Sequence, residues 1–299
     1  MRYLSVSDVW REKFGDKVYR LSIEGGKTCP NRDGTCSVGG CIFCAGGSGS
    51  FAESEGDVDL QLDLAKRRVA AKSNSDRFVA YFQSYTATYM PPEVLLERLM
   101  KAASRDDIVA ISVATRPDCL PDEILSVLDR VNKVKPVTVE LGLQTASDDT
   151  ARLINRGYPT ECYIEACEKL HSLGIEVVTH VIIGLPNETP DDLLKTIDLV
   201  GKTAQGVKLQ LMHVLRGTTL CKWYEQGKYT PLSMDEYIDL LCQCVENLPP
   251  DIVVHRLTGD GDKKLLVAPL WSADKKRVLN AITRRFEERD IIQGRKLKE

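Results

Sequence analysis

The strongest constraint on the fold is an alternation of short β-rich segments with longer helical ones over the first 215 residues. The β-rich segments are Lys17–Ile23, Phe78–Gln83, Ile108–Val113, Val137–Leu143, Ile175–Ile183 and Val207–Val214. Segments with helical periodicity lie between them, near 58–73, 92–104, 121–132, 160–173 and 190–204. Repeated βα units predict parallel strands joined by crossover helices. We therefore expect an α/β fold, with a partial (β/α)6 TIM-type barrel as first choice and a doubly wound open sheet as second.

The alternation stops near residue 215, and the remaining sequence has a different pattern. It predicts a helix over Ser233–Asn247, one more strand over Asp251–Leu257 and a charged amphipathic helix over Asp274–Arg295. We therefore expect a core barrel over residues 1–229 and a C-terminal α/β extension over residues 230–299.

Composition and charge exclude several classes of protein. The 299 residues are 43% hydrophobic and 28% charged with a net charge of −3, which is typical of a soluble globular protein. No apolar run reaches the ~18 residues that a membrane span needs, and the first residues lack the pattern of a signal peptide. We therefore expect a cytoplasmic protein without membrane contact. In that compartment, the ten cysteines indicate metal ligands rather than disulfides.

Four of the cysteines lie close together in the glycine-rich segment Thr28–Gly47, which ends in Cys41-x-x-Cys44 and Ala-Gly-Gly. Glycines permit a loop that wraps around a compact group. The segment follows the first predicted strand. In a parallel fold it therefore lies at the carboxyl edge of the sheet, where active sites form.

Four interpretations of this loop compete. Disulfides are disfavoured in a reducing compartment. A thioredoxin-like redox pair is weak because Cys41-x-x-Cys44 does not open a helix in the expected way. A structural zinc site would use all four thiolates, whereas an iron–sulfur cluster would use three and leave one iron open for a ligand. The loop alone does not decide between zinc and iron–sulfur.

The loop resembles the cluster loop of the radical S-adenosylmethionine (SAM) superfamily, through Cys41-Ile42-Phe43-Cys44 and the upstream run TCPNRDGT at Thr28–Thr35. The spacing departs from the commonest Cys-x3-Cys-x2-Cys form and is similar to that of an Elongator-like bacterial family. The resemblance extends over essentially the whole chain, including His255–Asp260. It implies the radical SAM core barrel, a bystander Cys36, and a [4Fe-4S] cluster held by Cys29, Cys41 and Cys44.

The resemblance also implies a SAM site at the strand ends. The segment from Leu141 to Arg156 is similar to one in oxygen-independent coproporphyrinogen oxidase, where a Gln and an Arg touch SAM. The superfamily's Gly-rich turn after the second strand is absent here, so the contact to the SAM amino group falls on Gln83–Thr86, with Ser84 preferred. His180–Pro186 matches the segment that flanks ribose and adenine. The implied SAM residues are Phe43, Gln83, Ser84, Thr86, Gln144, Arg156, His180 and Gly184.

The implied chemistry is reductive cleavage of SAM at the cluster, which forms a 5′-deoxyadenosyl radical that takes a hydrogen atom from the substrate. A flavodoxin or ferredoxin is the implied electron donor. The Elongator-like family is implicated in tRNA modification. This implies as substrate a wobble uridine whose C5 side chain changes from carboxymethylaminomethyl toward aminomethyl.

Basic clusters near the C-terminus support a nucleic-acid substrate, because such clusters neutralise phosphates. They are Lys263-Lys264, Lys275-Lys276-Arg277, Arg284-Arg285 and Arg295-Lys296. Candidate catalytic or substrate-binding residues are Arg116, Lys208 and His213. A small metabolite or peptide is the alternative substrate. The alternative of another class is a zinc- or cluster-containing nucleic-acid-binding protein without turnover.

Overall fold

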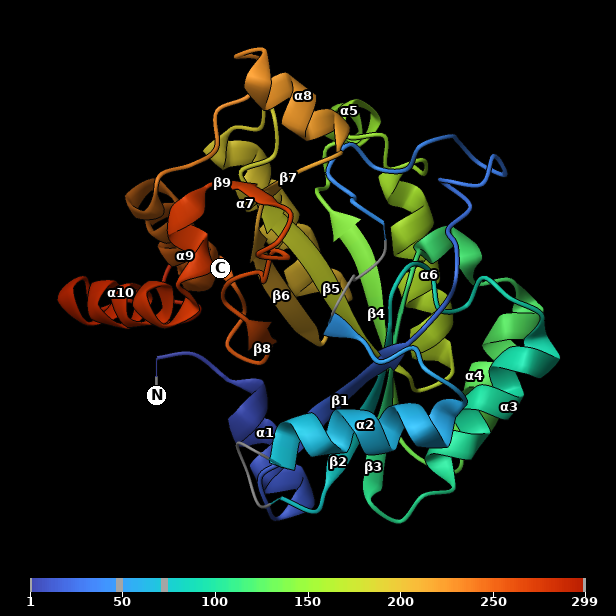
Figure 1. Ribbon diagram of the computed structural model, residues 1–299. Coiled ribbons are helices and arrows are strands. Elements are labelled where there is room, and N and C mark those ends of the chain that lie inside the picture. Colours follow the sequence, from blue (N-terminus) through green and yellow to red (C-terminus); the bar gives the residue numbers. More distant parts are fainter. Residues whose placement is uncertain (1, 47–50, 71–74, 298–299) are drawn as a thin grey trace.

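A curled parallel sheet forms the centre of the molecule (Figure 1). The computed structural model describes residues 2–46, 51–70 and 75–297. Within them the sheet has seven strands in the order β1-β2-β3-β4-β5-β6-β8, and every neighbouring pair is parallel. The strands are β1 (Tyr19–Glu24), β2 (Phe78–Gln83), β3 (Ile108–Thr115), β4 (Val137–Gln144), β5 (Glu176–Ile183), β6 (Gly206–Leu211) and β8 (Val253–Arg256). This order never reverses, as a doubly wound sheet would, so the predicted partial barrel is confirmed.

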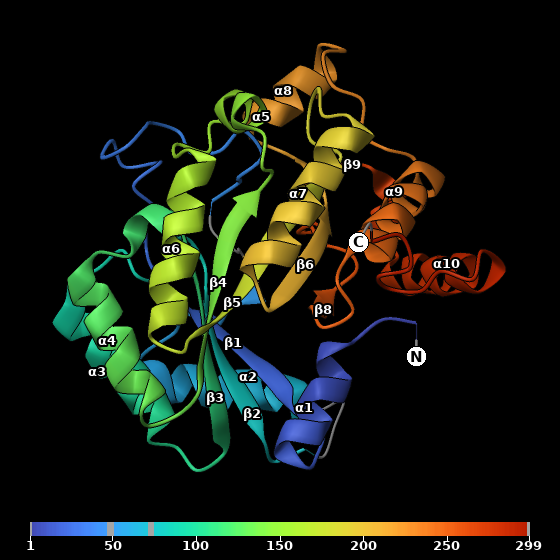
Figure 2. The same cartoon turned by 180° about the vertical axis from the view of Figure 1, so that it is seen from behind.

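Helices cover the outer face of the sheet (Figures 1 and 2). They are α2 (Val58–Ala70), α3 (Pro92–Ala103), α4 (Asp122–Asn132), α6 (Thr160–Ser172), α7 (Pro190–Thr203) and α9 (Met234–Asn247). Prolines occupy the first turn of α3 and α7, and capping boxes begin α7 at Thr189 and α9 at Ser233. Because these start signals are local, the sequence located the helices well. Residues 71–73 of the predicted helix 58–73 lie outside the described residues.

The sheet has an apolar outer face and a polar inner face. On β4, Val139, Leu141 and Leu143 are fully buried in the core that the sheet forms with the outer helices. Successive side chains of a strand point to opposite faces, so Glu140 points to the concave side. A closed barrel usually fills its interior with branched apolar residues. The polar inner face therefore indicates a site rather than a filled core.

The sheet does not close on itself, and the N-terminal segment lies between its two edge strands. Ahead of α1 (Val6–Phe14), the Leu4 carbonyl accepts a hydrogen bond from Val254 N–H of β8 at 2.8 Å. Trp10 of α1 packs edge-on against His255 of β8, and its ring centroid lies 4.8 Å from the Arg20 guanidinium of β1. The strand predicted over 251–257 is thus β8, and it extends the barrel from the expected six strands to seven.

The C-terminal segment packs on the barrel through the same apolar core. Helix α10 (Lys275–Glu288) buries Val278, Ile282 and Phe286 in the cluster that also holds the outer residues of the strands. A small antiparallel pair, β7 (Val214–Leu215) with β9 (Leu266–Ala268), and helix α8 (Thr219–Glu225) complete this part. The division into residues 1–229 and 230–299 stays a prediction. In the described part of the chain, no helix is long and apolar enough to cross a membrane.

Candidate active site at the carboxyl edge of the barrel

The cysteine loop lies over the carboxyl edge of the sheet, beside α8 and the short helix α5 (Asp148–Leu153) (Figure 1). It is bonded on two sides through Ile42. The N–H of Ile42 donates to the Ile154 carbonyl at 3.0 Å, and the N–H of Leu220 donates to the Ile42 carbonyl at 2.8 Å. Within the loop, Gly40 has a φ of +82°, which favours glycine. The loop is therefore shaped by its own chain and by both helices.

The Cys41 thiol lies close enough to Cys29 and Cys44 for their charges to act on it. Burial raises the pKa of the Cys41 thiol to about 12, and negative charge on Cys44 and Cys29 adds to the rise. Cys36, in contrast, is exposed, and its Sγ lies 3.9 Å from a carboxylate oxygen of Asp118. The structure thus brings the three predicted ligands together and gives Cys36 a different neighbour. The ligand set itself stays a prediction.

The donor set fits an iron–sulfur cluster. In the described ranges, no three His, Cys, Asp or Glu side chains are placed to hold a metal ion. A cluster does not require them to converge on one atom, because each thiolate binds a separate iron. The three thiols are partly buried in one loop, and a side-chain N–H donor, Asn31 Nδ2, lies 3.5 Å from Cys41 Sγ. Thiolate ligands with hydrogen-bond donors beside them are typical of such clusters.

Several residues predicted to bind SAM lie at the ends of β2, β4 and β5, and the backbone is strained at Ser84 and Gln144. Ser84, Gln144 and Gly184 have φ values of +90°, +61° and +91°. Positive φ is uncommon for residues other than glycine, and such strain gathers at ligand sites. Beside Ser84, the buried Thr86 hydroxyl has no hydrogen-bond partner among the described residues. A strained edge with an unpaired hydroxyl fits a site for a polar ligand such as SAM.

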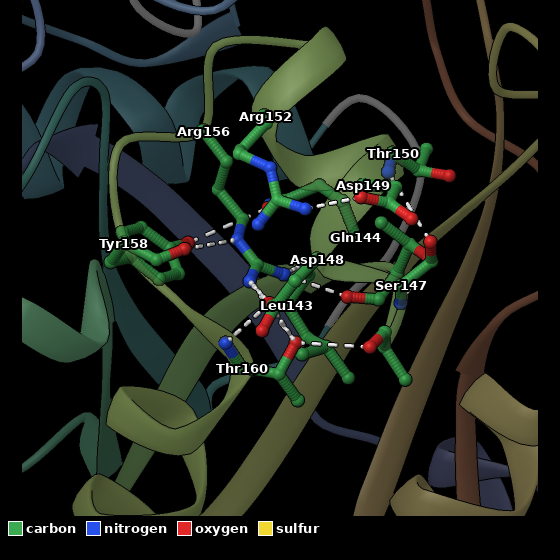
Figure 3. A network of polar contacts seen from close by, with 12 residues as sticks. Leu143, Gln144, Ser147, Asp148, Asp149, Thr150, Arg152, Arg156, Tyr158 and Thr160 are labelled. Atoms are coloured by element: carbon green, nitrogen blue, oxygen red, sulfur yellow. Dashed lines mark hydrogen bonds and ion pairs between the residues drawn. The ribbon is translucent and has the colours of Figure 1, made fainter.

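The guanidinium of Arg156 is fully bonded to the protein, as Figure 3 shows. Its N–H groups donate, at 2.7–3.2 Å, to oxygen atoms of Leu143, Thr145, Tyr158, Asp148 and Thr160. These five bonds use all five donors of a guanidinium. Two of the acceptors are the carbonyls on either side of Gln144, so Arg156 holds the strained turn in place. A bond from Arg156 to SAM, which stays a prediction, requires one of these partners to be replaced.

Tyr158 connects this turn with the cysteine loop. The guanidinium groups of Arg116 and Arg156 each lie 4.7 Å from the centroid of its ring. Its hydroxyl donates to the Gly142 carbonyl. Gly142 in turn leaves room for the Gln144 amide, because an added Cβ would lie 2.6 Å from Gln144 Nε2. The Gln144 side chain is therefore held in a defined place next to the strand end.

The other predicted SAM residues lie at or near the same edge. Phe43 is partly buried against the apolar cluster that includes Ile182. Gln83 ends β2, and its carbonyl accepts a hydrogen bond from Gly25 N–H at the end of β1. His180 lies on β5, four residues before Gly184, and its side chain belongs to a polar layer within the barrel.

This layer crosses the concave face and is centred on Glu140. The fully buried carboxylate accepts a hydrogen bond from Ser112 Oγ at 2.9 Å, lies 2.7 Å from His180 Nε2 and is bonded to Lys208 Nζ. Lys208 Nζ also donates to the Tyr81 hydroxyl at 3.0 Å. The layer therefore connects side chains from β2, β3, β4, β5 and β6.

The charges of the layer follow from burial and pairing. Burial alone would raise the pKa of Glu140, but attraction to Lys208 and the hydrogen bond from His180 hold it well below its ordinary value. Burial lowers the pKa of Lys208 to about 7, against the attraction of Glu140. Burial also lowers the pKa of His180. Glu140 is thus ionised at neutral pH, and His180 is a neutral imidazole able to bond a ligand.

The structure places the three candidate catalytic residues apart. Lys208 belongs to the inner layer. Arg116, after β3, makes two hydrogen bonds to Asp118, at 2.9 and 2.6 Å, beside the cysteine loop. His213, after β6, is half-buried beside a glycine-rich loop, where an added Cβ on Gly259 would lie 3.2 Å from its ring. Burial lowers the pKa of His213 to about 4. The three do not form one catalytic group, and a substrate role for each stays a prediction.

Sequence reasoning missed Glu140, Asn31 and Tyr158. Glu140 had a signal, because it is the one charged residue of the apolar strand VTVELGL, and buried acids are rare unless they are paired. Asn31 lies within the motif Thr28–Thr35, and the motif gives it no role of its own. Tyr158 gave no signal, since its place depends on two arginines from separate loops.

Comparison with known proteins places these features in a family. The sequence profile of the radical SAM superfamily matches residues 27–200, and that of the radical SAM C-terminal domain matches residues 204–288. The chain belongs to the radical SAM superfamily. YtqA of Bacillus subtilis is 44% identical to it over 98% of this chain and 92% of the relative's length.

Two further similarities are to a tRNA-modifying relative and to a solved structure. A tRNA uridine(34) acetyltransferase of Dehalococcoides mccartyi is 31% identical over 51% of this chain but only 33% of its own length. The archaeal Elp3 structure of Methanocaldococcus infernus has a TM-score of 0.71 at 17% identity, covering 92% of this chain and 64% of that chain. At that identity the likeness shows the fold. The Elongator-like resemblance is confirmed, and the protein is a radical SAM enzyme that uses a [4Fe-4S] cluster and SAM.

The first prediction concerns the cluster ligands. Cys29→Ala, Cys41→Ala and Cys44→Ala should each abolish cluster loading, because each removes the only thiolate of one iron, whereas Cys36→Ala should retain the cluster. Iron and sulfide content and visible absorbance after anaerobic reconstitution provide the measurement. Full loading of Cys29→Ala together with loss in Cys36→Ala would reverse the assignment.

The second prediction concerns SAM. Gln144→Ala should weaken SAM binding about tenfold to a hundredfold, since a hydrogen bond to a charged group is worth about 1.5–3 kcal/mol. Calorimetry on cluster-loaded protein measures the affinity, and iron content should not change. Gln226→Ala, at the exposed end of α8, is the matched control. Equal affinities of the Gln144 and Gln226 variants would show that the Gln144 amide does not bind SAM.

The third prediction concerns the inner layer. Glu140→Gln should lower the free energy of unfolding by about 3–5 kcal/mol, because it leaves the buried Lys208 without a counterion. The loss should be larger at pH 6 than at pH 9, since Lys208, with its pKa near 7, is protonated only at the lower pH. Glu140 itself is ionised at both, because its pKa is lowered.

Urea unfolding at both pH values measures this loss. Replacing both partners, by Glu140→Gln with Lys208→Met, should recover part of the stability, because the buried charge of Lys208 is then removed too and only Arg20, 3.8 Å from Glu140, still loses a partner. If the free energy of unfolding lost in the double variant equals the sum of the losses in the two single variants, Glu140 and Lys208 are not coupled.

Proposed function

We propose that the protein acts on tRNA and remodels the C5 side chain of a wobble uridine from carboxymethylaminomethyl toward aminomethyl. The observation that carries the proposal is its similarity, over about half of the chain, to a tRNA uridine(34) acetyltransferase. The particular side chain follows from the sequence resemblance to the Elongator-like bacterial family. When bound, the cluster and SAM supply one-electron chemistry that removes a hydrogen atom from the substrate.

The carboxyl edge of the barrel suits a base that leaves its stack. Anticodon loops are single-stranded, so a wobble uridine can turn into such a site without melting a duplex. In this proposal the strained turns at Ser84 and Gln144 orient SAM, and the neutral imidazole of His180 reaches the site from the inner layer. Rigid positioning of this kind is what the protein contributes to cofactor chemistry.

Four exposed basic side chains near the C-terminus support contact with a phosphate backbone. They are Lys263 and Lys264 before β9, and Lys276 and Arg277 in the first turn of α10. None of the four has an ion-pair partner in the described part of the chain. Other members of the predicted basic set are already paired, as Arg285 is with Asp235 and Asp239. The free members are therefore the ones proposed to bind tRNA.

The fourth prediction tests the substrate. Reconstituted enzyme with SAM and reduced flavodoxin should form 5′-deoxyadenosine faster in the presence of tRNA from a strain that lacks this gene. Mass spectrometry of the digested tRNA should show less carboxymethylaminomethyl nucleoside and more aminomethyl nucleoside. The Cys41→Ala protein with the same tRNA is the control.

The binding surface can be tested in the same system. Lys276→Glu combined with Arg277→Glu should weaken tRNA binding and reduce its salt dependence, because each lost phosphate contact removes about one unit of the slope. If tRNA does not accelerate turnover and the strain's wobble nucleosides are unchanged, the tRNA proposal is wrong and a small metabolite or peptide replaces it.

A further inference from the structure

Two side chains outside the cysteine set direct N–H groups at the predicted ligand thiols. Asn31 Nδ2 lies 3.5 Å from Cys41 Sγ, and Arg116 Nη1 lies 4.0 Å from Cys29 Sγ. Both side chains are buried, that of Asn31 completely. The first contact is a hydrogen bond to sulfur and the second places a permanent positive charge beside a thiol, since arginine is not deprotonated in proteins.

Arg116 is held rigidly in this position. Its Nε and Nη2 donate to the two carboxylate oxygens of Asp118 at 2.9 and 2.6 Å, and its Nη1 donates to the Arg156 carbonyl at 3.0 Å. The ring of Tyr158 stacks against the guanidinium. A bidentate carboxylate and a stacked ring together fix the orientation of an arginine.

Gly157 allows both donors to approach the cysteine loop. Its φ is +86°, and an added Cβ would lie 2.6 Å from Asn31 Oδ1 and 3.4 Å from Arg116 Nη2. Any side chain at this position would push Asn31 away from Cys41. The turn that contains Gly157 is therefore built around the two donors.

This arrangement differs from the role that the sequence predicts for Arg116, which is catalysis or substrate binding. Only 9% of its side chain is exposed, and Asp118 already occupies one edge of the guanidinium. Taking the guanidinium out of water costs desolvation free energy, and its partner Asp118 is itself an exposed residue. The charge is therefore explained better by what it faces, the thiol of Cys29, than by a contribution to stability.

We propose that Arg116 and Asn31 are positioning residues that raise the reduction potential of the iron–sulfur cluster. A reduced cluster carries one more negative charge than an oxidised one, so a fixed cation and an N–H donor at its ligand sulfurs stabilise the reduced form. In a buried site little water screens the charge. The proposal rests on the predicted ligands Cys29, Cys41 and Cys44, and it is independent of the tRNA substrate.

The fifth prediction is that two substitutions shift the midpoint potential of the cluster in opposite directions. A redox titration of the reconstituted protein, monitored by electron paramagnetic resonance, measures the shifts. Arg116→Met removes the cation and leaves Asp118, so the ratio of reduced to oxidised cluster at a fixed potential should fall about tenfold, or ~59 mV for one electron. Asp118→Asn removes the anion but keeps an acceptor for Arg116, so the ratio should rise. Asn31→Leu should lower the ratio less than Arg116→Met.

Arg152→Met is the matched control. Arg152 lies on the neighbouring helix α5, its side chain is 73% exposed, and its ion pair with Asp149 faces solvent, where water and salt screen the charge. Its midpoint potential should equal that of the unaltered protein.

Iron content is measured before each titration, so loss of the cluster is not read as a change of potential. If Arg116→Met does not load iron, the test compares Asp118→Asn, expected to raise the ratio of reduced to oxidised cluster, with Asn31→Leu, expected to lower it. Unchanged potentials in loaded variants, or shifts of the same sign for Arg116→Met and Asp118→Asn, would overturn the proposal. The cysteine variants test the ligand set separately, so a wrong ligand set and an absent charge effect give different results.

Discussion

All strands of the central sheet run in the same direction, and the rest of the site depends on this constraint. Parallel neighbours need a crossover connection between them, so every strand of the barrel ends at the same edge. The cysteine loop follows β1, Ser84 follows β2, Arg116 follows β3, Gln144 ends β4 and Gly184 follows β5. Segments far apart in the sequence therefore meet at one rim, where the cysteine loop and the turns predicted to bind SAM lie close together.

The rim is strained, and buried arginines hold it in that state. A residue in a sparsely populated backbone region costs about 1–3 kcal/mol and persists only when its surroundings over-determine it. At Gln144 the surroundings are the five hydrogen bonds of Arg156, two of them to the flanking carbonyls. Tyr158 carries the same constraint to Arg116 and so to the cysteine loop. The turn predicted to bind SAM and the cysteine loop are thus linked by one set of contacts.

Two ionic groups lie at different depths of the barrel. At the rim, the buried Arg116 pairs with the more exposed Asp118, and the cation faces the cysteine loop. Within the barrel, Glu140 pairs with Lys208, lies 3.8 Å from the Arg20 guanidinium and accepts a hydrogen bond from Ser112. Apolar residues of similar size often stabilise a protein as well as a buried ion pair does. The ion pair of Glu140 and Lys208 on the inner face is consistent with radical SAM chemistry, which needs a polar, ordered environment around a charged cofactor.

The sequence by itself determined the α/β class, the places of the strands and the cysteine motif, because these depend on local propensity and spacing. The predicted strand 137–143, for example, differs from β4 by one residue. Only the tertiary structure decided that the sheet curls in one direction, that β8 joins it, that Arg116 faces Cys29, and that Glu140 is paired with Lys208. These contacts join residues on different strands and loops, and a one-dimensional pattern carries no information on which distant side chains a curled sheet brings within hydrogen-bond distance.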